Sequence, residues 1–378
     1  MNSTSAMGDD GDTVYVVGAG LTGATAAFSL QRSGRRVVVL ERDKVVGGHT
    51  RSEWLNGVPY EPNGAHIFHT DDCEVWKLAS SLIEFVPYEH RVMTRIGAAC
   101  LSWPMQLDEL SGLREWPQIQ RELAALPAVP DNSNFRTWCL DIMGETIFEL
   151  FIAGYTTKQW GRDPSQLSTE FAPKRVELRD DGHLGLFRDP YQGWPRLGYG
   201  ALSEALLADV DLRLCEPVTA ANLAELVPPG APVVVTCPLD DYYDGAEGEL
   251  EWRGVRLVPH WLPDERLALG AMVVNEPDIE VPYTRAIETK HVFPELHDQP
   301  GTVVCYEYPG AAAKHYPVYD AGGLNRGIQT RYEQRLRAET RNPMLPAGRL
   351  ARYLYINMDE AMRQGLNAAR EVGSSVAS

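Results

Sequence analysis

Two histidines, His66 and His69, lie three residues apart in the stretch PNGAHIFHT, residues 62–70. Imidazole groups can bind a metal ion, transfer a proton near neutral pH, or serve as hydrogen-bonded parts of a core. No third ligand follows at a metal-like spacing, and none of the six cysteines forms a CxxC pair. We therefore predict no metal site, and the choice between a catalytic and a structural role depends on the elements that position this stretch.

A glycine pattern near the N-terminus predicts the first of those elements. Gly18, Gly20 and Gly23 form G-x-G-x-x-G after a β-branched run at 13–17, and a second apolar run ends in Glu41. Such glycines allow a tight turn, let a pyrophosphate approach the backbone and let a helix pack closely on a strand, while the acidic residue accepts hydrogen bonds from a ribose. The order strand, glycine turn, helix, strand therefore predicts a dinucleotide site rather than an ordinary glycine turn.

A second glycine pair indicates which dinucleotide binds. Gly47 and Gly48 follow closely behind Glu41, and this arrangement resembles the FAD-binding pattern of the glutathione-reductase-like flavoproteins. No second G-x-G-x-x-G occurs later in the chain, so the sequence predicts FAD without a separate domain for a nicotinamide electron donor.

Composition narrows the classes of partner. The 378 residues carry a net charge of −17, which disfavours nucleic-acid binding. No apolar run reaches the roughly eighteen residues that a transmembrane helix needs. The acidic, polar stretch 1–12 predicts a disordered tail and lacks the apolar part of a signal peptide. Together with cysteines that we expect to be free thiols, these features predict a cytoplasmic protein without a membrane partner.

The remaining patterns predict an α/β fold with three parts. Apolar residues at three- and four-residue spacing predict helices within 106–160, and short β-rich runs between turn signals predict an antiparallel sheet farther along the chain. The first part is a Rossmann-type FAD-binding domain made of residues 13–69, 196–245 and 343–378. An inserted, mainly helical domain spans 70–160. A substrate domain combines a glycine-dense mobile loop at 161–195 with the antiparallel β-sheet at 246–342.

Strings of residues along the chain resemble the UDP-galactopyranose mutases. GAHIFHT and GYTTKQWG are the most distinctive, and PLD, VPYTR, YP and GRL…YINMD follow in the family's order. The resemblance extends over nearly the whole chain, from Val14 to the C-terminal helix. It implies a mutase that interconverts the pyranose and furanose forms of a nucleotide-diphosphate sugar such as UDP-galactose.

The resemblance also implies a mechanism in which FAD is active when reduced. In that mechanism flavin N5 attacks the anomeric carbon, displaces the nucleoside diphosphate and forms a flavin iminium, through which the sugar ring opens and recloses. A nucleotide-diphosphate sugar is then the partner, and a homodimer is the assembly that the resemblance implies.

The positions of this sequence that match the family's motifs are the site residues that the resemblance implies. Arg175 and Arg285 match the arginines that clamp the diphosphate, since a guanidinium is always charged and binds phosphate oxygens in a fork. His69 matches a catalytic histidine near flavin N5, and His66 is expected to hold its loop by a hydrogen bond. The expected substrate pocket consists of Phe151, Tyr155, Thr156, Trp160, Asn275, Tyr316, Arg349 and Tyr355. The expected cofactor contacts are Gly18, Gly20, Gly23, Glu41, Gly47, Gly48, His66, Gly348, Arg349, Asn357 and Met358.

Four positions depart from the family's pattern. The mobile loop has Gly185 and Leu186 where the family usually has asparagine and tyrosine, Ile152 replaces an aromatic residue, and Asn357 replaces an aspartate. The change at Asn357 is mild. The changes at Gly185, Leu186 and Ile152 predict a different nucleotide, a different sugar such as a 6-deoxyhexose or a pentose, or a substrate from a specialised pathway rather than cell-wall galactofuranose. Two other functions stay open: an FAD-dependent oxidoreductase of the amine-oxidase type, and a nucleotide-sugar binding protein without catalysis. The aromatic residues of GYTTKQWG also have the spacing of a helix's core stripe.

Overall fold

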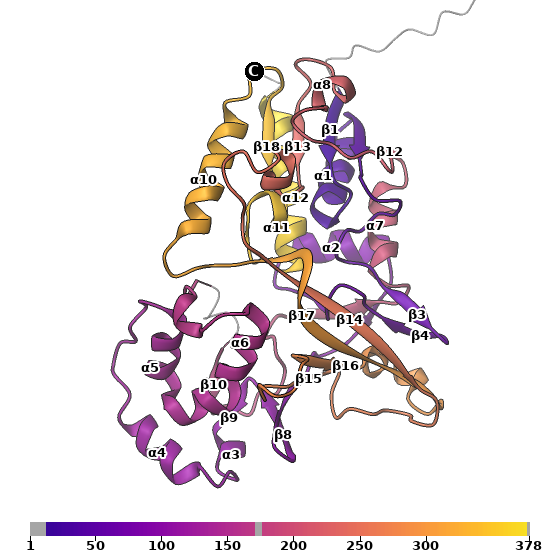
Figure 1. Ribbon diagram of the computed structural model, residues 1–378. Coiled ribbons are helices and arrows are strands. Elements are labelled where there is room, and N and C mark those ends of the chain that lie inside the picture. Colours follow the sequence, from indigo (N-terminus) through magenta and orange to yellow (C-terminus); the bar gives the residue numbers. More distant parts are fainter. Residues whose placement is uncertain (1–12, 171–175, 376–378) are drawn as a thin grey trace, which may run out of the picture.

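The upper part of the molecule is built on a parallel sheet of five strands (Figure 1). This computed structural model describes residues 13–170 and 176–375, so the predicted tail at 1–12 and Arg175 lie outside the described residues. The strand order is β12 (Asp211–Arg213), β2 (Arg36–Leu40), β1 (Thr13–Val17), β13 (Val233–Val235) and β18 (Met344–Pro346). All neighbouring strands are parallel, which confirms the Rossmann-type sheet.

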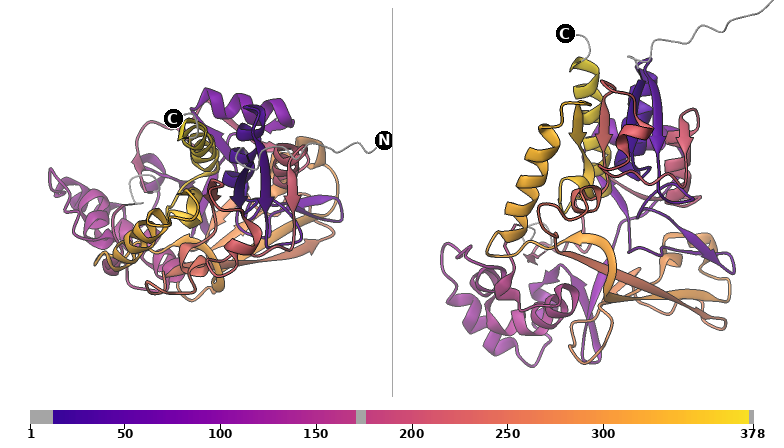
Figure 2. Two further views of the ribbon diagram at one scale, coloured as in Figure 1. Left: turned by 90° about the horizontal axis from the view of Figure 1, so that it is seen from above. Right: turned by 45° about the horizontal axis from the view of Figure 1, so that its top comes forward.

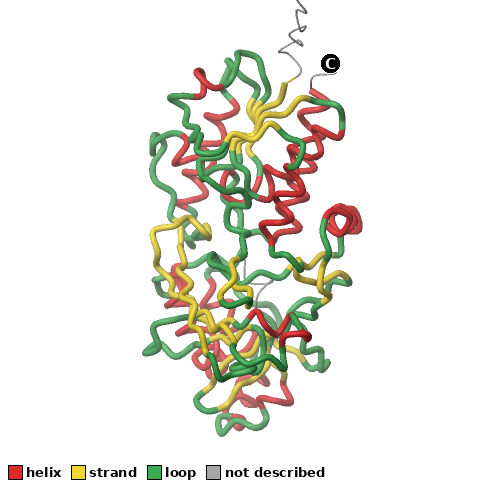
Figure 3. The backbone as a smooth tube through the Cα atoms, turned by 90° about the vertical axis from the view of Figure 1, so that its right-hand side faces the viewer, coloured by secondary structure: helices red, strands yellow, loops and turns green. Residues whose placement is uncertain are grey.

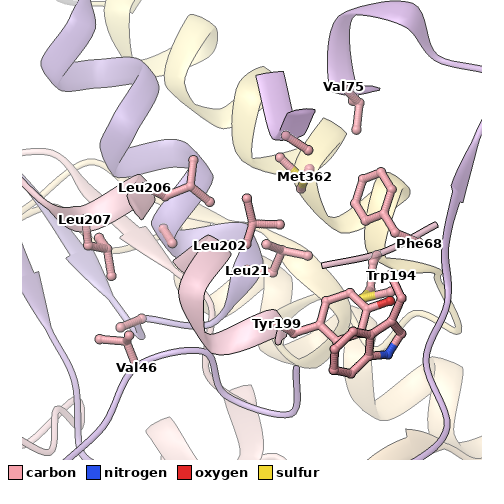
Figure 4. Packing of buried hydrophobic residues seen from close by; sticks show 14 of the residues in the cluster. Leu21, Val46, Phe68, Val75, Trp194, Tyr199, Leu202, Leu206, Leu207 and Met362 are labelled. Atoms are coloured by element: carbon pink, nitrogen blue, oxygen red, sulfur yellow. The ribbon is translucent and has the colours of Figure 1, made fainter. Parts of the chain in front are cut away.

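Helices cover both faces of this sheet (Figure 3). Successive side chains of a strand point to opposite faces, so Val14 and Val16 pack in one cluster and Tyr15 and Val17 in another. The first cluster, part of which is shown in Figure 4, includes residues of α1 (Leu21–Arg32), α2 (Cys73–Leu82), α7 (Tyr199–Leu207) and α12 (Met358–Ser375). The second cluster includes residues of α8 (Leu223–Leu226), α9 (Leu239–Tyr242) and α10 (Leu324–Arg337).

A sheet of six strands lies below the parallel sheet (Figure 2). Its order is β14 (Trp252–Leu262), β17 (Thr302–Pro317), β16 (Arg285–Ile287), β15 (Val273–Asn275), β7 (Val92–Ile96) and β8 (Ala99–Trp103). All neighbouring pairs are antiparallel except β15 with β7. The predicted antiparallel sheet is therefore confirmed.

Two predicted domain boundaries differ from the structure. Strands β7 and β8 lie within 70–160, which the sequence predicts to be mainly helical, yet they form a hairpin around Gly97 and extend the six-stranded sheet. Their partner β15 is far away in sequence, so local periodicity does not reveal the pairing. Helix α10 lies within 246–342, but its Ile328 and Tyr332 are buried against the parallel sheet rather than in the antiparallel one.

The helical part contains α3 (Leu107–Leu110), α4 (Trp116–Ala124), α5 (Phe135–Ile147), the π-helix η2 (Phe148–Ala153) and α6 (Gly154–Trp160). These helices share a core that includes Phe135, Phe148 and Trp160, and they confirm the helices predicted within 106–160. Among the residues that the structure describes, no helix combines the length and the apolar character needed to cross a membrane.

Short elements connect these parts. A three-stranded sheet joins β5 (Phe68–Thr70), β11 (Tyr191–Pro195) and β6 (Phe85–Pro87). Two strand pairs are β3 (Glu53–Leu55) with β4 (Val58–Tyr60), and β9 (Met105–Gln106) with β10 (Leu178–Arg179). The other short helices are η3 (Pro164–Gln166), η5 (Thr289–Val292), η6 (Pro294–Leu296) and α11 (Gly348–Ala351). The glycine-dense stretch at 161–195 thus contains β10 and β11, and its mobility stays a prediction.

Candidate functional site

A cavity of 450 Å³, called the upper cavity here, lies at the carboxyl ends of β1 and β2. The predicted cofactor residues that line it are Gly18, Gly20, Glu41, Gly47, Gly48, His66, Gly348, Arg349, Asn357 and Met358. Gly18 has a φ of +100°, and a Cβ on Gly20 would meet no atom within 4 Å, so the turn requires glycine at the first position and leaves open space at the second. Gly23 serves packing instead, because a Cβ there would lie 2.0 Å from the carbonyl oxygen of Gly18.

Glu41 braces the glycine turn from the end of β2. Its carboxylate accepts hydrogen bonds from the backbone N–H groups of Ala19 at 2.6 Å and Asp43 at 2.9 Å. Helix α1 begins at Leu21, next to the open side of Gly20. The N–H groups and the dipole of a helix N-terminus favour an anion, so this end of the upper cavity suits a phosphate.

A second cavity of 230 Å³, the lower cavity, lies between the six-stranded sheet and the helical part. The predicted site residues that line it are His66, His69, Phe151, Tyr155, Thr156, Trp160, Asn275, Arg285, Tyr316, Arg349, Tyr355, Asn357 and Met358. His66, Arg349, Asn357 and Met358 line both cavities, so the two cavities meet at these residues. Helix α12 starts at this junction, where the Glu360 carboxylate accepts a hydrogen bond from the N–H of Asn357 at 2.9 Å.

The register of the six-stranded sheet positions Arg285. Asn275 and Glu307 lie directly opposite Arg285 on β15 and β17, and residues opposite one another share a face of the sheet. Arg285 donates from Nε to Oε1 of the fully buried Glu307 at 2.9 Å and from Nη2 to Oε2 at 2.5 Å. Its Nη1 has no hydrogen bond to the described residues. Burial lowers the pKa of Arg285, but the Glu307 carboxylate outweighs burial and raises it well above the usual value, so the group stays charged.

Arg349 lies beside two tyrosines. Its guanidinium carbon is 5.5 Å from the ring centroid of Tyr316 and 5.9 Å from that of Tyr355. The ring of Tyr355 in turn lies 6.2 Å from that of Trp160. Burial raises the pKa of Tyr316, so its hydroxyl keeps the proton and can donate it to an anion. A cation, a hydroxyl donor and an aromatic wall therefore line the same cavity.

Helices η2 and α6 supply most of the aromatic side of the lower cavity. A π-helical turn is wider than an α-helical one, and η2 presents both Phe151 and Ile152 to the cavity beside Tyr155 of α6. Gly154 allows α6 to pack closely on the turn between β15 and β16, because a Cβ there would lie 2.1 Å from the carbonyl oxygen of Pro277.

Lys158, in the KQW string, ties α6 to the turn that leads into β16. Its Nζ lies 2.6 to 3.0 Å from four backbone carbonyl oxygens, those of Glu276, Asp278, Val281 and Tyr283, which share its three N–H groups. Because Arg285 is the first residue of β16, this lysine couples the aromatic wall to the arginine that faces it.

The two histidines of the PNGAHIFHT stretch have different surroundings. His66 lines both cavities, and its backbone N–H and its Nδ1 lie 2.5 and 3.2 Å from a carboxylate oxygen of the buried Glu61. His69 lines the lower cavity, where its Nδ1 lies 2.7 Å from Oδ2 of Asp189 and its ring stacks on Phe187 with 3.4 Å between centroids. His66 therefore borders both cavities and His69 borders the lower one, and the position of His69 near flavin N5 stays a prediction.

The loop before β11 closes part of the lower cavity. The N–H of Leu186 donates to the carbonyl of His90 at 2.7 Å, and the buried Arg179 donates to the carbonyl of Gly185 at 2.7 Å. Leu186 and Ile152 line the cavity, whereas Gly185 is not among its lining residues and forms a backbone bridge with Arg91. The departures from the family's pattern thus give the cavity two apolar side chains.

Sequence reasoning misses several residues of the two cavities. His90, Gln159 and Phe187 line the lower cavity, and His49 and His315 line the upper one. Gln159 lies inside the KQW string. His49 directly follows the Gly47-Gly48 pair and His315 directly precedes the YP string, so the only sequence signal for these residues is their closeness to a motif. No motif marks His90.

Two buried histidines, His90 and His315, and the partly buried His49 predict a loss of stability in mild acid. Burial lowers the pKa of His90 to about 3 and that of His315 to about 4, and it lowers that of His49 well below the usual 6.5. Below pH 6.5 these histidines are protonated in the unfolded state but stay neutral in the folded state. Each one therefore lowers the free energy of unfolding by about 1.4 kcal/mol per pH unit as the pH falls below the pKa that it has in the unfolded state. We expect the free energy of unfolding, measured in urea, to fall from pH 6.5 to about 5. Burial raises the pKa of Glu61 and of Asp359, which weakens this trend without matching three histidines.

His90→Asn removes one of these groups and should reduce the slope of the unfolding free energy against pH. His260→Asn changes an exposed histidine of β14 and should leave the slope as it is. A wild-type unfolding free energy that stays constant over this pH window would contradict the prediction.

Comparisons with known proteins point to one family. A family model described as UDP-galactopyranose mutase matches residues 150–355, and one described as an NAD(P)-binding Rossmann-like domain matches residues 16–82. A protein of Escherichia coli named dTDP-fucopyranose mutase is 29% identical, over 94% of this chain and 97% of that protein. A protein of Klebsiella pneumoniae named probable UDP-galactopyranose mutase is 30% identical, over 96% of this chain and 95% of that protein. A crystal structure of reduced UDP-galactopyranose mutase has the same fold, with a TM-score of 0.80 at 17% identity over 96% of each chain.

Proposed function

The chain belongs to the UDP-galactopyranose mutase family, a family of sugar-nucleotide mutases, and we propose that it interconverts the pyranose and furanose forms of a nucleotide-diphosphate sugar with reduced FAD as cofactor. The observation that carries this proposal is the meeting of the two cavities at His66, Arg349, Asn357 and Met358. A cofactor ring that extends from the upper cavity to this junction would contact a sugar in the lower cavity.

The residues of the upper cavity fit FAD. The open side of Gly20 and the N-terminus of α1 would hold the pyrophosphate, and the end of β2 at Glu41 would hold the adenosine ribose. The volume of 450 Å³ lies within the roughly 300–1,000 Å³ of ligand sites. When bound and reduced, FAD would supply the nucleophile for the anomeric carbon. Arg349 and Met358 would hold its other end at the junction.

Arg285 and Tyr316 of the lower cavity would hold the diphosphate. Arg285 is fixed along one edge by Glu307 and retains Nη1 for a phosphate oxygen, and Tyr316 offers a hydroxyl proton. Bound in this way, a departing diphosphate keeps its charge and stays close enough to attack again. Arg175 remains the proposed second arginine of this clamp.

The aromatic side of the lower cavity would hold the base. Phe151, Tyr155 and Trp160 offer flat surfaces for stacking. The side-chain oxygen of Gln159 is buried and has no hydrogen-bond partner among the described residues, so it can accept a hydrogen bond from an N–H of the base.

The two histidines would move protons while the sugar ring opens and closes. Opening requires a proton at the ring oxygen, and closure requires the removal of a proton from a sugar hydroxyl. Glu61 orients His66 and Asp189 orients His69, in each case through Nδ1, and such a carboxylate partner fixes the ring for proton transfer.

Turnover of a nucleotide furanose tests the proposal. The two relatives of nearly equal similarity are named for UDP-galactopyranose and dTDP-fucopyranose, so the two furanose counterparts are the first substrates to try. We expect dithionite-reduced, FAD-loaded protein to convert at least one of them to its pyranose, and chromatography of the two ring forms measures the conversion.

Oxidised protein is the control and should be inactive. Tight binding of both nucleotide sugars without conversion, when FAD is bound and reduced, would contradict the mutase and favour a binding protein. Bleaching of the flavin by an amine substrate without dithionite would favour the oxidoreductase instead.

A further inference from the structure

The wall of the upper cavity contains a stacked pair of histidines that the proposed reaction does not use. His49 lies in the loop directly after Gly48, and His315 lies on β17. Their ring centroids are 4.4 Å apart, with an angle of 27° between the ring planes. Both rings line the upper cavity, so the pair joins the glycine loop to the six-stranded sheet at one side of the predicted cofactor site.

The hydrogen bond at Nδ1 of His315 assigns the proton of its ring. The backbone N–H of Val255 lies within hydrogen-bond distance of this Nδ1, at 3.3 Å, and with Nδ1 as the acceptor the neutral ring carries its N–H at Nε2. Burial lowers the pKa of His315 to about 4, against the opposing effects of the Glu307 carboxylate and the Ala313 carbonyl, so the ring is neutral at neutral pH. His315 is only 4% exposed, and its Nε2 has no hydrogen-bond partner among the described residues.

Asn63, on another segment of the chain, also has a buried side-chain N–H group without a partner among the described residues. Its Nδ2 is buried without a hydrogen-bond partner in the described part of the chain, and the residue lines the upper cavity. A buried N–H without a partner costs about 1–3 kcal/mol, so two of them beside one cavity indicate acceptor atoms on a ligand. Arg349, which lines both cavities, donates to the carbonyl of His315 at 3.3 Å, so His315 lies near the junction.

We propose that Nε2–H of His315 and Nδ2–H of Asn63 donate hydrogen bonds to oxygen atoms in the flavin half of FAD, and that stacking on His49 fixes the His315 ring for this contact. The acceptors are the carbonyl oxygens of the flavin ring or the hydroxyl oxygens of its ribityl chain. The inference rests on the proposed cofactor, and it concerns the half of FAD near the junction rather than the adenosine half near Glu41. Both donors are neutral, so they hold these oxygens without adding positive charge.

Two isosteric variants test the inference. His315→Phe keeps a ring that can stack on His49 and removes the N–H, and Asn63→Leu keeps the size of the side chain and removes its donors. In full-length protein freed of flavin, we expect each variant to raise the Kd of FAD about tenfold and the double variant about a hundredfold, as followed by quenching of flavin fluorescence. The Kd of ADP, measured by calorimetry, should stay within about twofold, because ADP occupies only the adenosine half of the site.

A histidine outside both cavities is the matched control. His260→Phe, an exposed position on β14, should bind FAD and ADP as the wild type does. An unchanged Kd of FAD in both test variants would overturn the inference. An equal rise in the Kd of FAD and the Kd of ADP, together with a lower Tm, would also overturn it, because it would indicate a structural role. If His315→Phe does not fold, Asn63→Leu still tests the contact from a different segment. A wild-type chain that binds no FAD would instead refute the proposed cofactor, so the two failures are distinguishable.

Discussion

Replacement of Arg285 by alanine is expected to lower kcat/KM for the ring interconversion at least about a hundredfold. Glu307 holds the guanidinium through Nε and Nη2, so its orientation along the lower cavity does not depend on bound substrate. The variant loses a charge-assisted contact to the diphosphate, worth about 2–3 kcal/mol in the transition state. Initial rates of reduced protein over a range of substrate concentrations measure the effect.

The variant also leaves Glu307 fully buried without its partner, which destabilises a protein by about 3–5 kcal/mol. The double variant Arg285→Met, Glu307→Gln carries neither charge, so its stability should recover while its activity stays low. Arg256→Ala changes an exposed arginine of β14 and should alter neither quantity. Recovery of activity in the double variant would show that Arg285 acts through folding and does not contact the diphosphate.

Replacement of Lys158 by methionine is expected to lower the free energy of unfolding by about 3 kcal/mol and kcat/KM at least about tenfold. Methionine keeps much of the side-chain length but leaves four carbonyls of the turn before β16 without their shared donor. The turn can then move away from α6, which shifts Arg285 relative to Tyr155 across the lower cavity. Urea unfolding and initial rates measure the two effects.

Lys158→Arg distinguishes the geometry of this contact from its charge. The four carbonyls surround a single nitrogen, which suits a compact ammonium and not a planar guanidinium, so arginine should restore little of the stability. Lys77→Met, at an exposed lysine of α2, should change neither stability nor activity. Wild-type stability in Lys158→Met would rule out a supporting role for the lysine.

The dinucleotide-binding part is predictable from sequence because its signals are local. Strand, glycine turn, helix and acidic residue follow one another within 13–41, and each glycine has a role that backbone geometry dictates. The hairpin of β7 and β8 is not predictable in this way, because it becomes part of a sheet only by pairing with β15. Helix α10 likewise has an ordinary amphipathic pattern, and which sheet it covers depends on the path of the whole chain.

Motifs identify many residues that line the two cavities but not the direction in which each one points. His66 and His69 belong to one short string, yet the carboxylate partner of His69 is Asp189 in a distant loop. His49 and His315 stack only because the glycine loop and β17 come together in the folded chain. Contacts of this kind join segments far apart in the sequence, so residue spacing carries no record of them.

The shared border of the two cavities also limits how this enzyme can diverge. A substitution at Arg349 or Met358 changes the lining of both cavities at once, and with it the surroundings of both proposed ligands, so selection for a new sugar would rarely accept it. Ile152 and Leu186 touch the lower cavity alone, and exchanges there leave the cofactor's surroundings intact. Evolution of substrate range, in nature or in directed libraries, should therefore be concentrated on η2 and on the loop before β11.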